Sequence, residues 1–151
     1  MFSLSKQECE IIKSIFNTAK ENDLLIIKRA INEVKNCNGL YQLVIKAGSD
    51  LNKSKLCIIE KTGLGDKLSG QLSMILWFLV KPKIERQKRL KFGITEAIWV
   101  YEDFLCKHPG HFFLNGKKYQ IKKGIKTGLF KRIHPGQLVG CGCMSRVATP
   151  F

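Results

Sequence analysis

The sequence lacks a hydrophobic segment long enough to cross a membrane. Its longest apolar run, Leu72 to Val80, contains a serine and falls far short of the roughly 20 residues that a membrane helix needs. The first residues, Met1 to Leu4, lead into a charged amphipathic stretch instead of the long apolar core of a signal peptide. We therefore expect a protein that has no membrane partner and is not secreted through a signal peptide.

Internal repeats and low-complexity segments are also absent, which excludes a solenoid, a collagen-like protein or a disordered chain. With 151 residues, 44% hydrophobic and 25% charged, the chain can bury about two thirds of its unfolded surface without needing cross-links. The six cysteines are thus expected to be thiols or metal ligands and not a disulfide framework. Three of them, Cys9, Cys37 and Cys57, occupy helical apolar positions and are predicted to be small core residues.

Acidic residues are scarce in the second half of the sequence. Residues 81–151 hold 15 Lys or Arg against four Asp or Glu, which gives +11 of the total formal charge of +14. Such a field favours an anionic partner, which can be nucleic acid, an acidic protein surface or anionic lipid. A basic face that is merely solvated is the alternative.

Helical periodicity dominates the first two thirds of the chain. Ser5 and Glu8 form a capping-box pattern that predicts a helix start at Lys6, and Asn22 or Asp23 is predicted to cap the second helix. A kink at Pro82 is expected to separate two further helices. The predicted helical or apolar segments are 6–20, 24–37, 40–45, a segment that starts after Ser49 or Asp50, 67–80, and 82–90.

From Gly93 the pattern changes to short β-like runs separated by Gly and Pro. We predict strands at 97–101 and 143–148, and a hairpin in which Asn115-Gly116 joins 112–114 to 117–121. The expected fold class is α+β. An N-terminal helical region, residues 1–92, would pack against a small β-rich module, residues 93–151, to form one compact unit.

All three histidines and three of the six cysteines lie in this β-rich block. Cys141 and Cys143, with further ligands among His111, His134, His108 and Cys106, could hold tetrahedral Zn²⁺ and so tie a loop to the last strand. The sequence favours the set Cys141, Cys143, His111 and His134. Against zinc stands the Cys-x-Cys spacing, because alternate side chains of a strand spread apart. A disulfide or plain packing of the thiols therefore remains open. With zinc bound, the block could also be a zinc-stabilised nucleic-acid-binding module.

A catalytic interpretation of the same block is the alternative. His111 with Glu102 or Asp103 could form the acid–base pair of a small metal-independent ribonuclease-like toxin, with Lys118 or Arg132 holding the phosphate. The competing interpretation is that each histidine only holds a loop by hydrogen bonds. Two His-Pro-Gly sequences, at 108–110 and 134–136, are predicted to start turns.

The best candidate surface for nucleic acid is a group of lysines and one arginine interleaved with aromatic residues. Contacts of these cations to phosphates would give affinity that depends on salt and not on sequence. Trp99 is predicted to anchor the core of the β-module and not to stack on bases, because its neighbours in the strand are apolar. The cationic residues are Lys117, Lys118, Lys122, Lys123, Lys126, Lys131 and Arg132.

The order of motifs in the block resembles the C-terminal domain of phage Mu F-like minor head proteins, also called head morphogenesis proteins. The resemblance is carried by Gly93-Ile94-Thr95 with Trp99, the His108 to His111 loop, Asn115-Gly116-Lys117-Lys118-Tyr119, and Pro135-Gly136 followed by Cys141-Gly142-Cys143. The chain departs from the family at Gly142, where Arg is common, and at Asp66 and Gln71, where an Arg-Asp-Gln tract is expected. The long N-terminal half of family members is missing.

The resemblance implies a phage or prophage protein that is associated with the capsid in few copies. It implies portal or capsid proteins as partners, DNA as a further partner, and a location in the virion or the host bacterial cytoplasm. It implies no catalytic residues, so we expect no enzyme and no cofactor other than the structural zinc considered above. The apolar 72–80 helix is the segment expected to contact a partner protein.

Overall fold

The structure is a computed structural model that describes residues 3–148, so the last three residues of the predicted module lie outside it. The chain is an α+β protein, as predicted. Its internal contacts divide it into two compact units, Met1–Lys81 and Pro82–Phe151, which we call the helical unit and the C-terminal unit. The division falls inside the longest helix, so the last turns of that helix belong with the strands. Within residues 3–148, no helix has the length and hydropathy of a membrane span.

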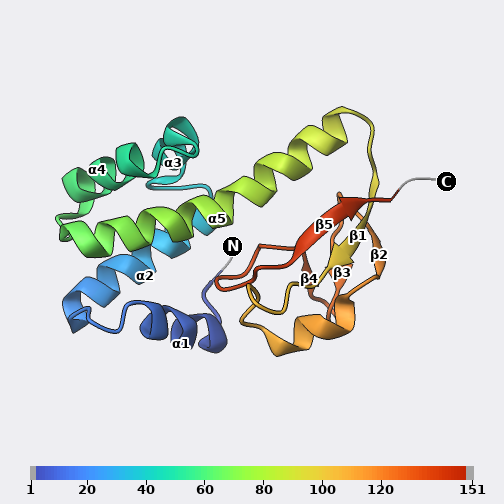
Figure 1. Cartoon of the computed structure of the whole chain (residues 1–151), viewed down its shortest axis with the longest axis horizontal. Helices are drawn as coiled ribbons and strands as arrows, with labels where there is room; N and C mark the ends of the chain where they lie inside the picture. The colour runs from blue at the N-terminus through green and yellow to red at the C-terminus, as the bar shows by residue number, and fades with distance from the viewer. Residues whose placement is uncertain (1–2, 149–151) are drawn as a thin grey trace. The chain divides into compact units, whose positions relative to one another are not determined.

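The described residues form five α-helices (Figure 1): α1 (Lys6–Ile15), α2 (Glu21–Lys35), α3 (Tyr41–Ala47), α4 (Leu51–Thr62) and α5 (Asp66–Lys91). The capping box of α1 is present, with Ser5 Oγ accepting from Glu8 N at 3.1 Å and Ser5 N donating to Glu8 Oε1 at 3.1 Å. Asp50 caps α4. The caps predicted for α2 were wrong, because α2 already begins at Glu21 and its N-cap residue, Lys20, provides no side-chain hydrogen bond.

The core of the helical unit includes one buried ion pair. Glu8 and Lys35 lie 2.7 Å apart between Oε2 and Nζ, and their side chains are 1% and 4% exposed. Both charges are thus removed from water, where an ion pair of this kind depends on mutual compensation. The core around them consists of Ile11, Ile12, Phe16, Ile27, Ala30, Ile31, Val34, Leu40, Tyr41, Val44, Ala47, Ile58, Leu64, Leu72, Leu76 and Val80.

Cys37 is not a core residue, which corrects the prediction. It is exposed and has a φ of 60°. The backbone N–H of Cys37 donates to Val34 O, and the backbone N–H of Asn38 donates to Glu33 O. Cys37 therefore occupies the left-handed position of a Schellman motif that ends α2. Cys9 and Cys57 are half-buried. Apolar periodicity alone thus misplaced a residue that lies just beyond the helix end.

α5 runs through Pro82 as one helix, where the sequence predicted two. The apolar 72–80 segment buries one face only: Leu72, Leu76 and Val80 are at most 1% exposed, whereas Met74 and Phe78 are 47% and 59% exposed. Because Pro82 has no N–H, one helical hydrogen bond is missing at that point. Pro82 is also where the C-terminal unit begins.

The C-terminal unit contains a three-stranded antiparallel sheet in the order β2-β1-β5 (Figure 1). Its strands are β1 (Glu96–Val100), β2 (Lys118–Gln120) and β5 (Met144–Val147). Ala97 and Trp99 of the central strand are fully buried, and Ala97 lies opposite Tyr119 on one side and Val147 on the other. Alternation along β1 thus directs Trp99 into the core, as predicted.

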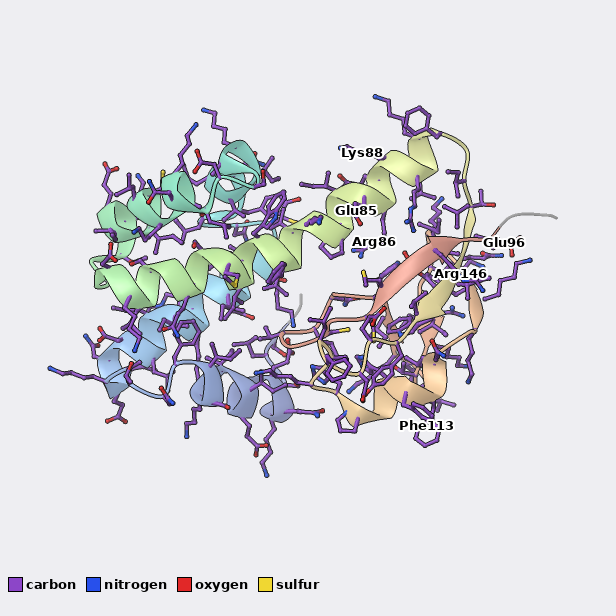
Figure 2. The ribbon with its side chains drawn as sticks, in the orientation of Figure 1. Glu85, Arg86, Lys88, Glu96, Phe113 and Arg146 are labelled. Carbon is purple, nitrogen blue, oxygen red and sulfur yellow. The ribbon has the colours of Figure 1, made fainter. Side chains whose placement is uncertain are left out.

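The predicted hairpin at Asn115-Gly116 was wrong. Residues Pro109–Leu114 form a 3-10 helix, η1, and β2 pairs with β1. The turn is held by β1 instead: Gly116 N donates to Trp99 O at 2.8 Å, and Asn115 Oδ1 accepts from Tyr101 N at 3.0 Å. Pro109 at the first position favours the helical turn. Phe113 then projects outward from η1 and is 74% exposed (Figure 2).

A second, two-stranded sheet pairs β3 (Ile125–Lys126) with β4 (Arg132–Ile133). The last turns of α5 are joined to β5, since Arg89 donates to Ser145 Oγ at 2.6 Å and to Ser145 O at 3.2 Å. Arg86 lies on the side of α5 that faces the strands, whereas Lys88 lies on the opposite side (Figure 2). Burial lowers the pKa of Arg86, and Tyr119 opposes this shift.

Candidate metal centre

Four metal-ligating side chains meet in the C-terminal unit. One ligand atom from each of Cys106, His111, Cys141 and Cys143 lies within 4.8 Å of every other. The three sulfur atoms surround one ring nitrogen: the distances from His111 Nδ1 to Sγ are 3.5 Å for Cys106, 3.4 Å for Cys141 and 3.8 Å for Cys143. These residues come from two loops that are distant in the sequence.

The first loop follows β1 and supplies Cys106 and His111. After β1 the chain turns, with Cys106 N donating to Glu102 O at 2.8 Å, and this turn directs Cys106 inward, where it is 7% exposed. η1 then places His111 in its first turn, 8% exposed. The His111 ring packs edge-on against Trp99, with 5.6 Å between centroids and an interplanar angle of 83°. Burial and ring packing therefore fix the imidazole before any ligand binds.

The second loop precedes β5 and supplies Cys141 and Cys143. Residues at i and i+2 of an extended segment point to the same side, and here both sulfurs reach His111. Gly142 between them packs so closely on Leu105 that a Cβ atom would overlap the backbone there. Gly142, which stands where the resembling family commonly has Arg, is thus required by the close approach of the two loops.

We predict that Gly142→Ala weakens metal binding by roughly tenfold or more and destabilises the C-terminal unit by about 1–3 kcal/mol, because the added methyl group has no space. Gly110→Ala is the matched control, since Gly110 has open space where the Cβ would lie. Competition with a colorimetric zinc chelator measures the affinity, and urea unfolding measures the stability. Equal affinities of the two variants would contradict a close-packed loop.

Hydrogen bonds outside the cluster connect and orient the two loops. His108, 3% exposed, stacks on His111 at 4.9 Å between centroids, and its Nε2 lies 2.7 Å from Val139 O. A carbonyl oxygen can only accept, so Nε2 of His108 carries the proton. Lys107 N also donates to Gly140 O at 2.8 Å. His108 is therefore a support for the site and not one of its ligands.

Backbone and indole N–H groups surround the sulfurs. Gly136 N donates to Cys141 Sγ at 3.3 Å. The buried Trp99 Nε1 has no conventional hydrogen-bond partner among residues 3–148, yet it lies close enough to Cys143 to stabilise its thiolate. N–H donors of this kind favour the thiolate over the thiol, and the thiolate is the form that binds a metal.

The cluster also favours one ionised thiol. The hydrogen bond from Cys141 lowers the pKa of Cys143 to about 4 against the opposing effect of burial, and His111, Trp99 and Cys106 add to the lowering. For Cys141, the hydrogen bond with Cys143 raises the pKa, and burial of the Cys141 thiol raises it further. Burial raises the pKa of Cys106, against the backbone hydrogen bonds of His108 and Gly142. Three adjacent sulfurs cannot all become thiolates unless a cation compensates the charge.

The residues fit tetrahedral zinc. Zn–S bonds of about 2.3 Å and Zn–N bonds of about 2.0–2.1 Å require S···N separations of about 3.5 Å around a tetrahedral ion. The three separations at His111 Nδ1 are 3.4 to 3.8 Å. Three thiolates and one imidazole complete four-coordination, so the arrangement leaves no open position for substrate and suits a structural site.

The structural cluster differs from the set favoured by the sequence in one member. His134 lies outside the cluster. Its ring Nε2 is 2.9 Å from Ile121 O, and its backbone N–H donates to Gln137 Oε1 at 2.9 Å. Burial, together with Arg86, lowers the pKa of His134. Cys106 takes the fourth position. The sequence contained Cys106 as an alternative, but only the path of the β1–η1 loop shows that it faces the other three.

The residues of the catalytic interpretation are arranged differently. His111 Nδ1 is directed at the sulfurs, while Asp103 is exposed and accepts from the Tyr101 hydroxyl at 3.3 Å. The contact of Glu102 with this loop is made by its backbone, because the carbonyl oxygen of Glu102 accepts a hydrogen bond from Cys106 N. The buried ring of His111 thus points toward metal ligands.

The seven predicted nucleic-acid-binding residues are all exposed. Four of them, Lys118, Lys123, Lys126 and Arg132, line one hollow, and the other three, Lys117, Lys122 and Lys131, are not part of its lining. The sequence indicated the cationic character of the surface but not its division into these two groups.

Comparison of the chain with family models, with curated proteins and with solved structures finds no match.

Proposed function

We propose that the C-terminal unit is a structural zinc module in a non-enzymatic phage or prophage minor head protein. The observation that carries the zinc part is the convergence of three sulfurs on His111 Nδ1 at 3.4 to 3.8 Å. The head-associated role is supported by the ordered motifs from Gly93 to Cys143 in the sequence. The metal supplies cross-linking, and the chain supplies a buried, hydrogen-bonded set of ligands.

A structural role for zinc follows from the composition of the core. Its buried members are Ala97, Trp99, Cys106, Leu114, Tyr119, Ile121, Ile125 and Cys143. Two of these eight are ligands, so the metal lies at the centre of the packing and not at its edge. Zinc-bound cysteines of this kind stabilise small units whose apolar core is too small to fold alone.

The zinc proposal is tested by the metal content of protein purified without chelator. We expect one zinc per chain, and we expect Co²⁺ to replace it with the visible absorption of a tetrahedral thiolate site. Cys141→Ser should reduce the zinc content below about one fifth, whereas Cys57→Ser, a change outside the cluster, should leave it unchanged. Zinc-free wild-type protein that is fully folded would refute the proposal.

The head-associated role is tested separately. Portal and large-terminase genes are expected beside the gene for this protein, and the protein encoded by that portal gene is expected to co-purify with the chain when the two are co-expressed. An adjacent small immunity gene, together with RNA cleavage that is lost in His111→Ala but kept in Cys141→Ser, would instead establish the ribonuclease alternative. The gene neighbourhood and the co-purification do not depend on the zinc measurement.

A further inference from the structure

A cationic hollow lies beside the two-stranded sheet of the C-terminal unit. Its volume is about 330 Å³, and its lining includes Lys118, Lys123, Lys126 and Arg132 but no acidic residue. Tyr119 and Gln120 add polar groups to the same lining. The four cations come from β2, from the turn after it, from β3 and from β4 (Figure 1). We call this site the cationic hollow.

Most of this positive charge is not compensated by the protein. Lys118 forms an ion pair with Glu96 at 3.0 Å, but that carboxylate stands outside the lining. Among residues 3–148, no ion pair involves Lys123, Lys126 or Arg132. Lys126 lies directly opposite Arg132 in the strand pairing, and like charges in that position repel each other. A bound anion would relieve this repulsion.

The shape of the hollow is fixed by tight backbone packing. Gly124, with a φ of 79°, lies so near Ile133 O that a Cβ would be only 2.6 Å from that oxygen. Arg132 Nη1 donates to Gly124 O at 3.3 Å, which orients the guanidinium at the edge of the lining. The glycine thus lets the turn approach β4, and the hydrogen bond restrains the exposed arginine.

We infer that the cationic hollow binds a phosphate group of a nucleic-acid strand. Lysine and arginine side chains that line one hollow from four segments suit the tetrahedral oxygens of phosphate. The volume also leaves room for the attached sugar. The inference rests on the proposed function, because it gives the DNA contact of the zinc-stabilised unit a defined position.

The test compares two double variants that remove the same charge. Lys123→Gln/Lys126→Gln changes the hollow, and Lys117→Gln/Lys131→Gln changes two exposed lysines outside its lining. We expect the hollow variant to bind a fluorescent single-stranded DNA roughly tenfold more weakly than wild type and the outer variant at most about threefold more weakly. Equal losses would show a diffuse charge effect and overturn the inference.

Competitors identify the chemistry that is bound. Pyrophosphate should displace the labelled DNA from wild type at lower concentration than sulfate does, and the hollow variant should lose this difference. Displacement by polyglutamate that matches an oligonucleotide of equal charge would assign the hollow to acidic proteins and overturn the phosphate assignment. Zinc content is measured for every variant. If both double variants keep one zinc per chain and lose DNA binding equally, only the inference about the hollow is rejected. If the wild-type protein is folded without zinc, the proposed function is rejected.

Discussion

Removal of zinc is expected to unfold the C-terminal unit and to leave α1 to α4 helical. A unit of about 70 residues has a net stability of only ~4–10 kcal/mol. Structural zinc contributes an apparent ~10–16 kcal/mol in small zinc-stabilised domains at neutral pH. Because Cys106 and Cys143 are themselves core residues, loss of the metal also leaves buried thiols where the packing needs a fixed centre. If zinc is bound as we propose, the metal is expected to decide whether this unit folds.

Trp99 reports on this unfolding. It is fully buried beside His111, and Trp77→Phe removes the second tryptophan, which lies in the helical unit. In that background, a strong chelator should shift the Trp99 emission to longer wavelength, while the far-ultraviolet circular dichroism keeps most of its helical signal. Added zinc should reverse the shift. Cys143→Ser should show the shifted emission even without chelator.

The control is Cys9→Ser, which lies in α1 and should respond to chelator as wild type does. An emission spectrum of Trp99 that stays unchanged after complete metal removal would contradict the structural role of zinc. Parallel loss of the helical signal would contradict the expectation that α1 to α4 fold without the metal.

The helices could be predicted from the sequence because their signals are local. Ser5 and Glu8 specify a capping box within one turn, and Asp50 specifies the start of α4 in the same way. The error at Asn115-Gly116 lies where a local signal competes with a distant contact. Asn115-Gly116 favours a hairpin, yet the segment before it forms η1 and the strand after it pairs with β1.

The metal centre could be predicted only in part, for a related reason. Cys141 and Cys143 were recognisable as candidate ligands because they lie two positions apart and are chemically rare. The choice between Cys106 and His134 depends on which loop faces the pair, and no local pattern contains that information. His134 is engaged by the Ile121 carbonyl, a contact between residues whose proximity follows only from the complete fold. The close approach of Gly142 to Leu105 is likewise visible only in three dimensions.

The second large effect is expected in the helical unit, where Lys35→Met should destabilise the protein by about 3–5 kcal/mol, the usual cost of leaving one member of a buried ion pair uncompensated. Glu8 Oε2 lies 2.7 Å from Lys35 Nζ and both side chains are almost fully buried. Without the ammonium group, the Glu8 carboxylate loses its paired cation, while the capping hydrogen bond from Ser5 N at 3.1 Å remains.

Glu8→Gln combined with Lys35→Met should recover most of that loss. The amide oxygen of glutamine can still accept from Ser5 N and so keep the capping box, and the methionine fills the space without a charge. The double variant is therefore expected to be more stable than Lys35→Met alone, with a coupling energy of about 2 kcal/mol or more between the two positions. Urea unfolding followed by circular dichroism measures Lys35→Met, Glu8→Gln and the double variant.

Lys55→Met provides the matched comparison, because Lys55 pairs with Asp66 at 3.0 Å while the Asp66 side chain is 78% exposed. A surface pair of this kind contributes about 0–1 kcal/mol. If Lys35→Met costs no more than Lys55→Met, the pair inside the helical unit is open to water in solution. If it costs several times more and the double variant recovers the loss, Glu8 and Lys35 compensate each other within a dry core.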